Sequence, residues 1–141
     1  MTRLLGLDVG DRRIGVAVGD TETRLATPLR TVARSAKPEL DVAAIVRLAG
    51  EEAAEALVVG LPLTESGEAG SQARAVRSFT GRLARDLHLP IHWQDERYST
   101  FEAARRLGPA GGSRQRQRRR REEELDAMAA AIILQTYLDA G

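Results

Sequence analysis

Cysteine is absent from the 141-residue sequence, and this absence removes several kinds of site. A disulfide framework, a cysteine-ligated zinc site and a cysteine nucleophile are all excluded. Long apolar runs are missing too, since the longest, residues 127–134, is too short to cross a bilayer. No basic segment followed by a long apolar stretch marks a signal peptide. We therefore expect a cytoplasmic protein that does not enter a membrane.

Lysine is nearly absent, because Lys37 is the only one and arginine supplies the other positive side chains. The net charge is only +1, yet six arginines fall at positions 114, 116 and 118–121 with no acid among them. Such a segment can neutralise phosphates and give salt-dependent affinity for a nucleic acid. A solvated surface loop is the alternative. The glycine-rich and then arginine-rich composition predicts a mobile basic loop at about 109–121.

The length suits a single domain spanning residues 1–141. Apolar patterning and turn residues predict strands at 3–9, 14–19, 26–32, 56–60 and 91–95, and helices at 38–50, 71–87, 99–107 and 122–140. Three strands come first, and strands and helices then alternate. This order predicts an α/β fold with a five-stranded mixed sheet, in which three antiparallel strands are followed by parallel strands joined by crossover helices.

Asp8 lies near the end of the first predicted strand, on the face opposite to Leu5 and Leu7. A carboxylate in a central strand is costly unless it is paired or binds a cation. The neighbouring Gly6 and Gly15 are small enough to leave room for a ligand. The alternative is that Asp8 only caps the following turn, and the local sequence supports both interpretations equally.

Asp126 opens an apolar stripe on the last predicted helix, with Ala130, Ile133 and Tyr137 at i+4, i+7 and i+11. Because this stripe should face the sheet, the carboxylate is expected to point inward. The alternative is a favourable interaction with the helix N-terminus. That alternative explains an acid in the first turn but not an acid on the buried stripe, so we favour a role in a site.

Glu96 follows the strand predicted at 91–95, at the edge where α/β sheets place ligands. Asp95 is a rival, because strand alternation allows only one of the two to point at the site. The alternative is that Glu96 is a solvent-exposed loop acid paired with Arg97.

Three acids at the ends of different elements point to a hard divalent cation. Mg²⁺ and Mn²⁺ prefer oxygen ligands, and such ions can activate water and stabilise the leaving oxygen in phosphodiester cleavage. We therefore predict a metal-dependent nuclease with Asp8, Glu96 and Asp126 as both catalytic and metal-binding residues. The arginines expected to contact nucleic acid are Arg12, Arg13, Arg97, Arg114, Arg116, Arg118, Arg119 and Arg120.

Four segments, in order along the chain, resemble motifs of the YqgF/RuvX family. They are residues 6–17, residues 59–63 with Gly67 and Gly70, residues 95–100 and residues 125–135. The resemblance covers nearly the whole chain. One departure is Glu122-Glu123-Glu124 at the predicted helix start, where a basic-to-apolar sequence is commoner. Glu122 or Glu123 could supply a fourth carboxylate, or the three could form a solvated first turn.

The resemblance implies an RNase H-like fold, the acidic triad Asp8, Glu96 and Asp126, and Mg²⁺ or Mn²⁺ as the cofactor. Family members are described as nucleases for the 5′ end of pre-16S rRNA and as Holliday junction resolvases. The leading hypothesis is therefore 5′-end processing of pre-16S rRNA in ribosome biogenesis. The alternatives are a resolvase of branched DNA, which needs two active sites and hence a dimer, and a non-catalytic RNA-binding assembly factor. We expect a monomer or a weak homodimer with a nucleic acid as its partner.

Overall fold

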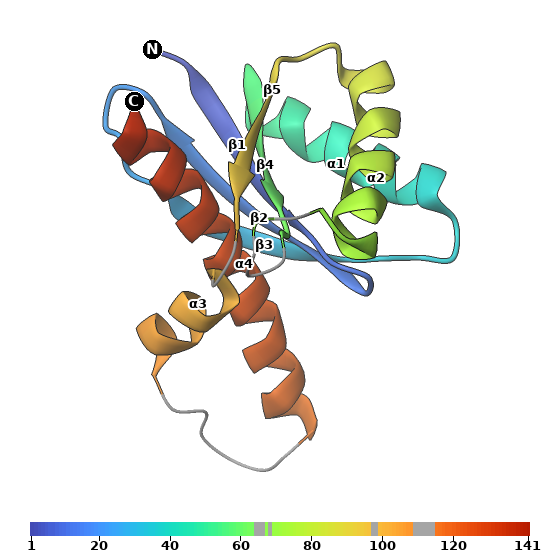
Figure 1. Ribbon diagram of the computed structural model, residues 1–141, viewed down its shortest axis with the longest axis vertical. Coiled ribbons are helices and arrows are strands. Elements are labelled where there is room, and N and C mark those ends of the chain that lie inside the picture. The colour runs from blue at the N-terminus through green and yellow to red at the C-terminus, as the bar shows by residue number, and fades with distance from the viewer. Residues whose placement is uncertain (64–66, 68, 97–98, 109–114) are drawn as a thin grey trace.

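The computed structural model describes residues 1–63, 67, 69–96, 99–108 and 115–141 (Figure 1). Its elements follow the order expected from the sequence. They are β1 (Arg3–Val9), β2 (Arg13–Asp20), β3 (Thr27–Ala33), α1 (Pro38–Glu51), β4 (Ala56–Leu61), α2 (Ser71–Leu87), β5 (Ile91–Asp95), α3 (Ser99–Leu107) and α4 (Gln115–Ala140).

The five strands form one sheet in the order β3-β2-β1-β4-β5. β2 pairs antiparallel with both β1 and β3, whereas β4 pairs parallel with β1 and with β5. This confirms the predicted mixed sheet. In the register of β1 and β2, Asp8 lies opposite Gly15. Asp8 is thus at the carboxyl end of the central strand, beside the carboxyl end of β4.

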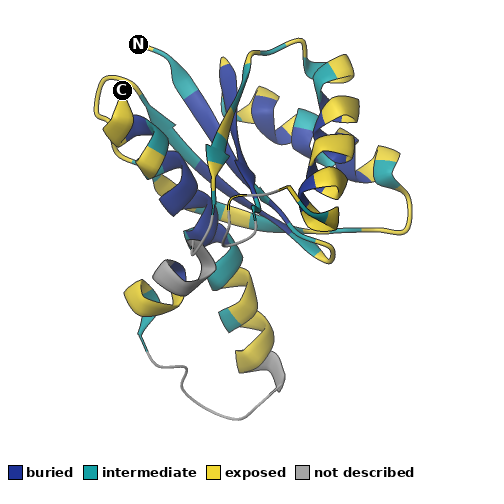
Figure 2. Ribbon diagram, viewed as in Figure 1, coloured by how far each residue is buried: buried dark blue, intermediate teal, exposed yellow. Residues whose placement is uncertain are grey.

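Helices cover both faces of the sheet (Figure 1). On one face, strand residues such as Leu5, Leu7 and Val59 form a core with α1 and α2. On the other face, Leu4 and Val58 join a second core with α4. Figure 2 shows the buried residues running through the strands and continuing into the inner sides of these helices. Within the part of the chain that the structure describes, no helix combines the length and apolarity needed to cross a membrane.

The last helix starts earlier than the sequence predicts. A mobile loop was expected through residue 121, but α4 begins at Gln115, so that prediction is wrong for residues 115–121. Residues 109–114 lie outside the described residues. The helix can start early because arginine, glutamine and glutamate are good helix formers. In addition, three arginines precede three glutamates by four residues each, which places opposite charges on the same side of a helix.

The early part of α4 projects beyond the sheet together with α3 (Figure 1). Ala103 of α3 packs against Ala129 and Ile132 of α4 in a small third core. The Arg121 guanidinium donates a hydrogen bond to the carbonyl of Gly108, just after α3. One arginine of the basic segment therefore joins the two helices and does not face solvent as a loop residue would.

Candidate active site

Asp8 and Glu96 meet at the carboxyl ends of β1 and β5. The side chain of Glu96 lies within hydrogen-bonding reach of that of Asp8, and a hydrogen bond between these two carboxyl groups requires a proton on one of them. Glu96 also lies over the backbone of β4, since a Cβ added to Gly60 would be 2.8 Å from Glu96 Oε2. Any larger residue at Gly60 would therefore occupy the space of the Glu96 carboxylate.

Strand alternation separates Glu96 from its rival Asp95. The His92 ring stacks on Tyr137 of α4 with ring centroids 5.1 Å apart, so the even-numbered positions of β5 face α4. Ile91 packs in the core on the α1/α2 side, and Asp95 shares its parity. The structure thus brings Glu96, and not Asp95, to Asp8.

Asp126 reaches the same place from α4. A Cβ added to Gly15, the residue paired with Asp8, would lie only 1.9 Å from the backbone carbonyl oxygen of Asp126. The helical stripe behind Asp126 faces the sheet as predicted, since Ala130 and Ile133 are buried. Asp126 itself keeps a side-chain exposure of 25%. It is therefore inward-facing but open to a ligand.

The small residues near Asp8 serve the helix and not a ligand. A Cβ on Gly6 would lie 2.9 Å from Leu134 Cβ, and one on Gly15 would collide with the Asp126 backbone. The expected room for a ligand at Gly6 and Gly15 is thus taken by α4.

The electrostatics of Asp8 reflect this crowding of acids. Burial raises the pKa of Asp8 above its ordinary value, and the negative charge of Asp126 raises it further, whereas the hydrogen bond with Glu96 lowers it. The net result is a raised pKa, because the contact with Glu96 lowers the pKa of Asp8 by less than burial and Asp126 together raise it. The three predicted acids are therefore close enough to influence one another.

Arg13, at the start of β2, lies between two acids of α4. Its Nε donates to Asp126 Oδ2 at 2.5 Å, and its Nη1 is 3.3 Å from Glu122 Oε2. The hydrogen bond to Asp126 is the main reason that the pKa of Arg13 is raised. Sequence analysis predicted Arg13 only as a nucleic-acid contact. Its pairing across 113 residues has no local sequence signal.

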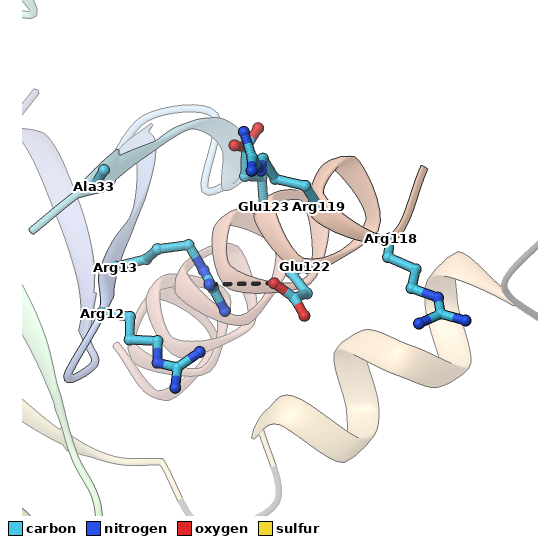
Figure 3. Close-up of a pocket in the computed structure, with 7 residues that line it drawn as sticks. All are labelled: Arg12, Arg13, Ala33, Arg118, Arg119, Glu122 and Glu123. Atoms are coloured by element: carbon cyan, nitrogen blue, oxygen red, sulfur yellow. Dashed lines mark ion pairs between the residues drawn. The ribbon is translucent and has the colours of Figure 1, made fainter. Parts of the chain in front are cut away.

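An open groove of about 640 Å³ runs beside this ion pair (Figure 3). Four predicted nucleic-acid contacts line it, together with two acids and one small residue: Arg12, Arg13, Arg118, Arg119, Glu122, Glu123 and Ala33. Arg120 lines a different depression, of about 420 Å³, on another side of α4. Arg97 and Arg114 lie outside the described residues, as does the side chain of Arg116.

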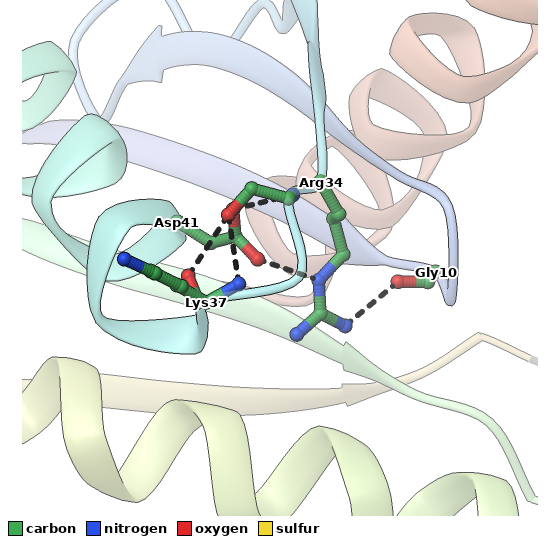
Figure 4. Close-up of polar contacts among 5 residues, drawn as sticks. Gly10, Arg34, Lys37 and Asp41 are labelled. Atoms are coloured by element: carbon green, nitrogen blue, oxygen red, sulfur yellow. Dashed lines mark hydrogen bonds and ion pairs between the residues drawn. The ribbon is translucent and has the colours of Figure 1, made fainter.

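Arg34 holds the turn between Asp8 and Arg13 from the side of α1 and α2 (Figure 4). Arg34 Nη1 donates to the carbonyl of Gly10 at 3.0 Å, and its backbone N–H donates to the carbonyl of Arg12 at 2.8 Å. Its Nε lies 3.3 Å from Oδ2 of the buried Asp41 in α1, and its guanidinium stacks 4.9 Å from the ring centroid of Phe79 in α2. Both helices of the far face therefore fix the turn that carries the site.

Residues 2–140 match the RuvX family, which is described as a Holliday junction resolvase. The chain belongs to this family. A relative from Chloroflexus aggregans, named "Putative pre-16S rRNA nuclease", is 45% identical over 137 residues, covering 97% of this chain and 93% of the relative. A relative of the same name from Synechocystis sp. is 45% identical over 135 residues, covering 96% and 86% of the two chains.

Two solved structures share the fold of this RuvX-family chain. T. thermophilus RuvC in complex with a Holliday junction substrate superposes with a TM-score of 0.60 at 16% identity, covering 99% of this chain and 95% of the other. The yeast mitochondrial Holliday junction resolvase Ydc2 gives 0.55 at 12% identity, with coverage of 97% and 78%. The predicted RNase H-like fold is confirmed.

The acids of this RuvX-family site fit a divalent cation in their chemistry. All three offer carboxylate oxygens, and a cation would offset both the burial and the charge of Asp126 that raise the pKa of Asp8. Among the residues described, however, no three His, Cys, Asp or Glu side chains are already gathered tightly enough to hold an ion. Oδ2 of Asp126 is paired with Arg13, so a cation held by this residue would bind through Oδ1 or replace Arg13.

Proposed function

We propose that the chain is a divalent-metal-dependent nuclease that hydrolyses phosphodiester bonds during 5′-end processing of pre-16S rRNA. The observation that carries this proposal is the convergence of Asp8, Glu96 and Asp126 next to an arginine-lined groove. The name shared by relatives at 45% identity supports the substrate. We assign the activity to one domain, residues 1–141, acting in the cytoplasm on ribosomal precursors.

The acids and the arginines have different proposed roles. Asp8, Glu96 and Asp126 would hold Mg²⁺ or Mn²⁺, which supplies an activated water and neutralises charge on the leaving oxygen when bound. Arg118 and Arg119 face the groove, where they bind phosphates of the strand and orient it toward the acids.

Branched DNA is a second candidate substrate, because the family that the chain matches is described as a Holliday junction resolvase. Symmetric cutting of a four-way junction needs two copies of the site. A dimer formed on junction DNA, with cleavage of the junction in preference to rRNA, would favour this candidate over the first.

Cleavage assays with a matched pair of variants test the proposal. Purified chain is incubated with end-labelled rRNA precursor, duplex RNA or a DNA junction, in Mg²⁺, Mn²⁺ or EDTA. Cleavage should require the metal, and Asp8→Asn should lower it at least about 100-fold, because metal-assisted charge stabilisation supplies several kcal/mol.

Asp86→Asn is the control, since Asp86 is exposed on α2, away from the acids. It should cleave like the unmodified chain. Equal cleavage by Asp8→Asn and by the unmodified chain would show that a contaminating nuclease is responsible and would leave an RNA-binding assembly factor as the better description.

A further inference from the structure

Glu122 lines the arginine-rich groove, and its negative charge opposes the positive charge of the groove. Glu122 lies within ion-pair distance of Arg13, 3.3 Å between Oε2 and Nη1, and both line the groove with Arg118 and Arg119 (Figure 3). Neither member is deeply buried, with side-chain exposures of 28% for Arg13 and 55% for Glu122. A phosphate in the groove can therefore reach the same guanidinium.

Glu122 is placed for this contact by the helix. Glu122 and Asp126 are four residues apart, so their side chains lie on one side of α4 and a single guanidinium can bind both. The backbone at this point is anchored to the sheet, because Thr31 Oγ1 of β3 donates to the carbonyl of Glu123 at 2.6 Å. This anchor favours release of Arg13 by a turn of the Glu122 side chain over a shift of the helix.

We propose that Glu122 holds Arg13 beside Asp126 and competes with a nucleic-acid phosphate for the guanidinium, so that Arg13 contributes its full charge to binding only when Glu122 is displaced. This inference rests on the proposed function, because it assumes that the groove binds RNA. A single phosphate that binds Arg13 forms one exposed ion pair but breaks the pair between Arg13 and Glu122. A strand that also reaches Arg12, Arg118 and Arg119 gains additional pairs in the same event. Glu122 thus makes the groove selective for extended polyphosphates over mononucleotides.

RNA binding in EDTA, measured by fluorescence anisotropy over a range of salt concentrations, tests the role of Glu122 directly. The probe is a labelled single-stranded RNA oligonucleotide. Glu122→Gln should bind about twofold to fivefold more tightly, the range expected for an exposed ion pair. The slope of log K against log salt should steepen by about 0.7, the value for one more phosphate contact on a single strand.

Glu124→Gln is the matched control, because it removes the same charge two residues further along α4, and Glu124 lines the other depression. Its salt slope should stay unchanged. In an Arg13→Ala background, Glu122→Gln should no longer steepen the slope. Equal slopes for the two glutamine variants, or a steeper slope without Arg13, would overturn the inference while leaving the nuclease proposal intact. No binding by the unmodified chain would instead contradict the proposed function itself.

Discussion

At the scale of single residues, Asp8 is held where a carboxylate is costly. Burial and the charge of Asp126 both disfavour its ionised form, and the hydrogen bond with Glu96 does not compensate. A group with this environment opposes folding once it ionises. Residues kept in such positions are typical of functional sites, where stability is sacrificed for a charged arrangement.

Asp8→Asn should therefore stabilise the metal-free chain at pH 7, by about 1 kcal/mol, the low end of the cost of a buried polar group, since Asp8 is half-buried and has Glu96 as a partner. Because the folded-state pKa of Asp8 is raised, the folded chain binds this proton more tightly than the unfolded chain. Ionisation of Asp8 therefore begins to lower the free energy of unfolding as pH rises above the unfolded-state pKa of about 3.9. The loss is complete above the folded-state pKa. Urea unfolding in EDTA at pH 7 and near pH 4 measures it.

The stabilisation should be large at pH 7 and much smaller near pH 4, because Asp8 is then only about half ionised in the unfolded chain. Asp86→Asn should show no such pH-dependent gain, since Asp86 is exposed. A less stable Asp8→Asn chain at pH 7 would mean that Asp8 is better compensated than its surroundings indicate.

At the scale of elements, the site depends on how closely α4 approaches the sheet. Glycines of three neighbouring strands lie beneath the helix, and each would clash with it if it carried a Cβ: Gly6, Gly15 and Gly60. At Gly15 the clash is with backbone, which cannot turn aside as a flexible side chain can. Asp126 can therefore lie over Asp8 because Gly15 of β2 has no side chain.

Gly15→Ala should destabilise the chain by at least about 2–3 kcal/mol, because overpacking against backbone forces α4 away from the sheet. Gly81→Ala is the comparison, since nothing lies within 4 Å of the added Cβ on α2. It should be neutral or stabilising by up to about 1 kcal/mol, as expected for glycine in a helix. Chemical denaturation of both variants gives the difference, and equal stability of the two would contradict the close packing of α4.

At the scale of the whole molecule, exposed arginines lie on both faces of the sheet. Arg118 and Arg119 of α4 line the groove, whereas Arg82 and Arg85 are exposed on α2, which packs on the opposite face of the sheet. A nucleic acid bound in the groove should therefore be sensitive to the first pair and largely insensitive to the second.

Replacing Arg118 and Arg119 together by alanine should weaken RNA binding and make the salt slope shallower by about 1.4, the loss of two phosphate contacts. The double alanine variant at Arg82 and Arg85 removes the same charge from the far face. Its slope should match that of the unmodified chain. If both double variants changed the slope equally, binding would depend on overall charge and not on the groove.

The sequence predicted the sheet and most boundaries because these depend on local patterns. The helix predicted at 71–87 and the strands at 3–9 and 91–95 match α2, β1 and β5. The inward orientation of Asp126 followed from its apolar stripe. By contrast, the choice of Glu96 over Asp95 required the parity of β5 relative to α4, and the Arg13–Asp126 pair joins residues 113 apart. Such contacts follow from three-dimensional packing and leave no local pattern.

The start of α4 was missed for a related reason. Composition alone predicted a mobile loop that included 115–121, because that stretch has no apolar residue. The helix is supported by its arginine–glutamate spacing and by the hydrogen bond from Arg121 to Gly108, a partner on another element. Propensity and tertiary contact together outweighed the lack of an apolar face.

The docking of α4 also has a consequence for the order in which the chain becomes competent. Asp8, Glu96 and Asp126 belong to three segments widely separated in sequence, and the last of them is carried by α4, which contacts strands across the whole sheet. A chain with the sheet formed but α4 undocked would hold Asp8 and Glu96 without Asp126, and its groove would lack Arg118 and Arg119. The proposed nuclease activity should therefore appear only after α4 has docked.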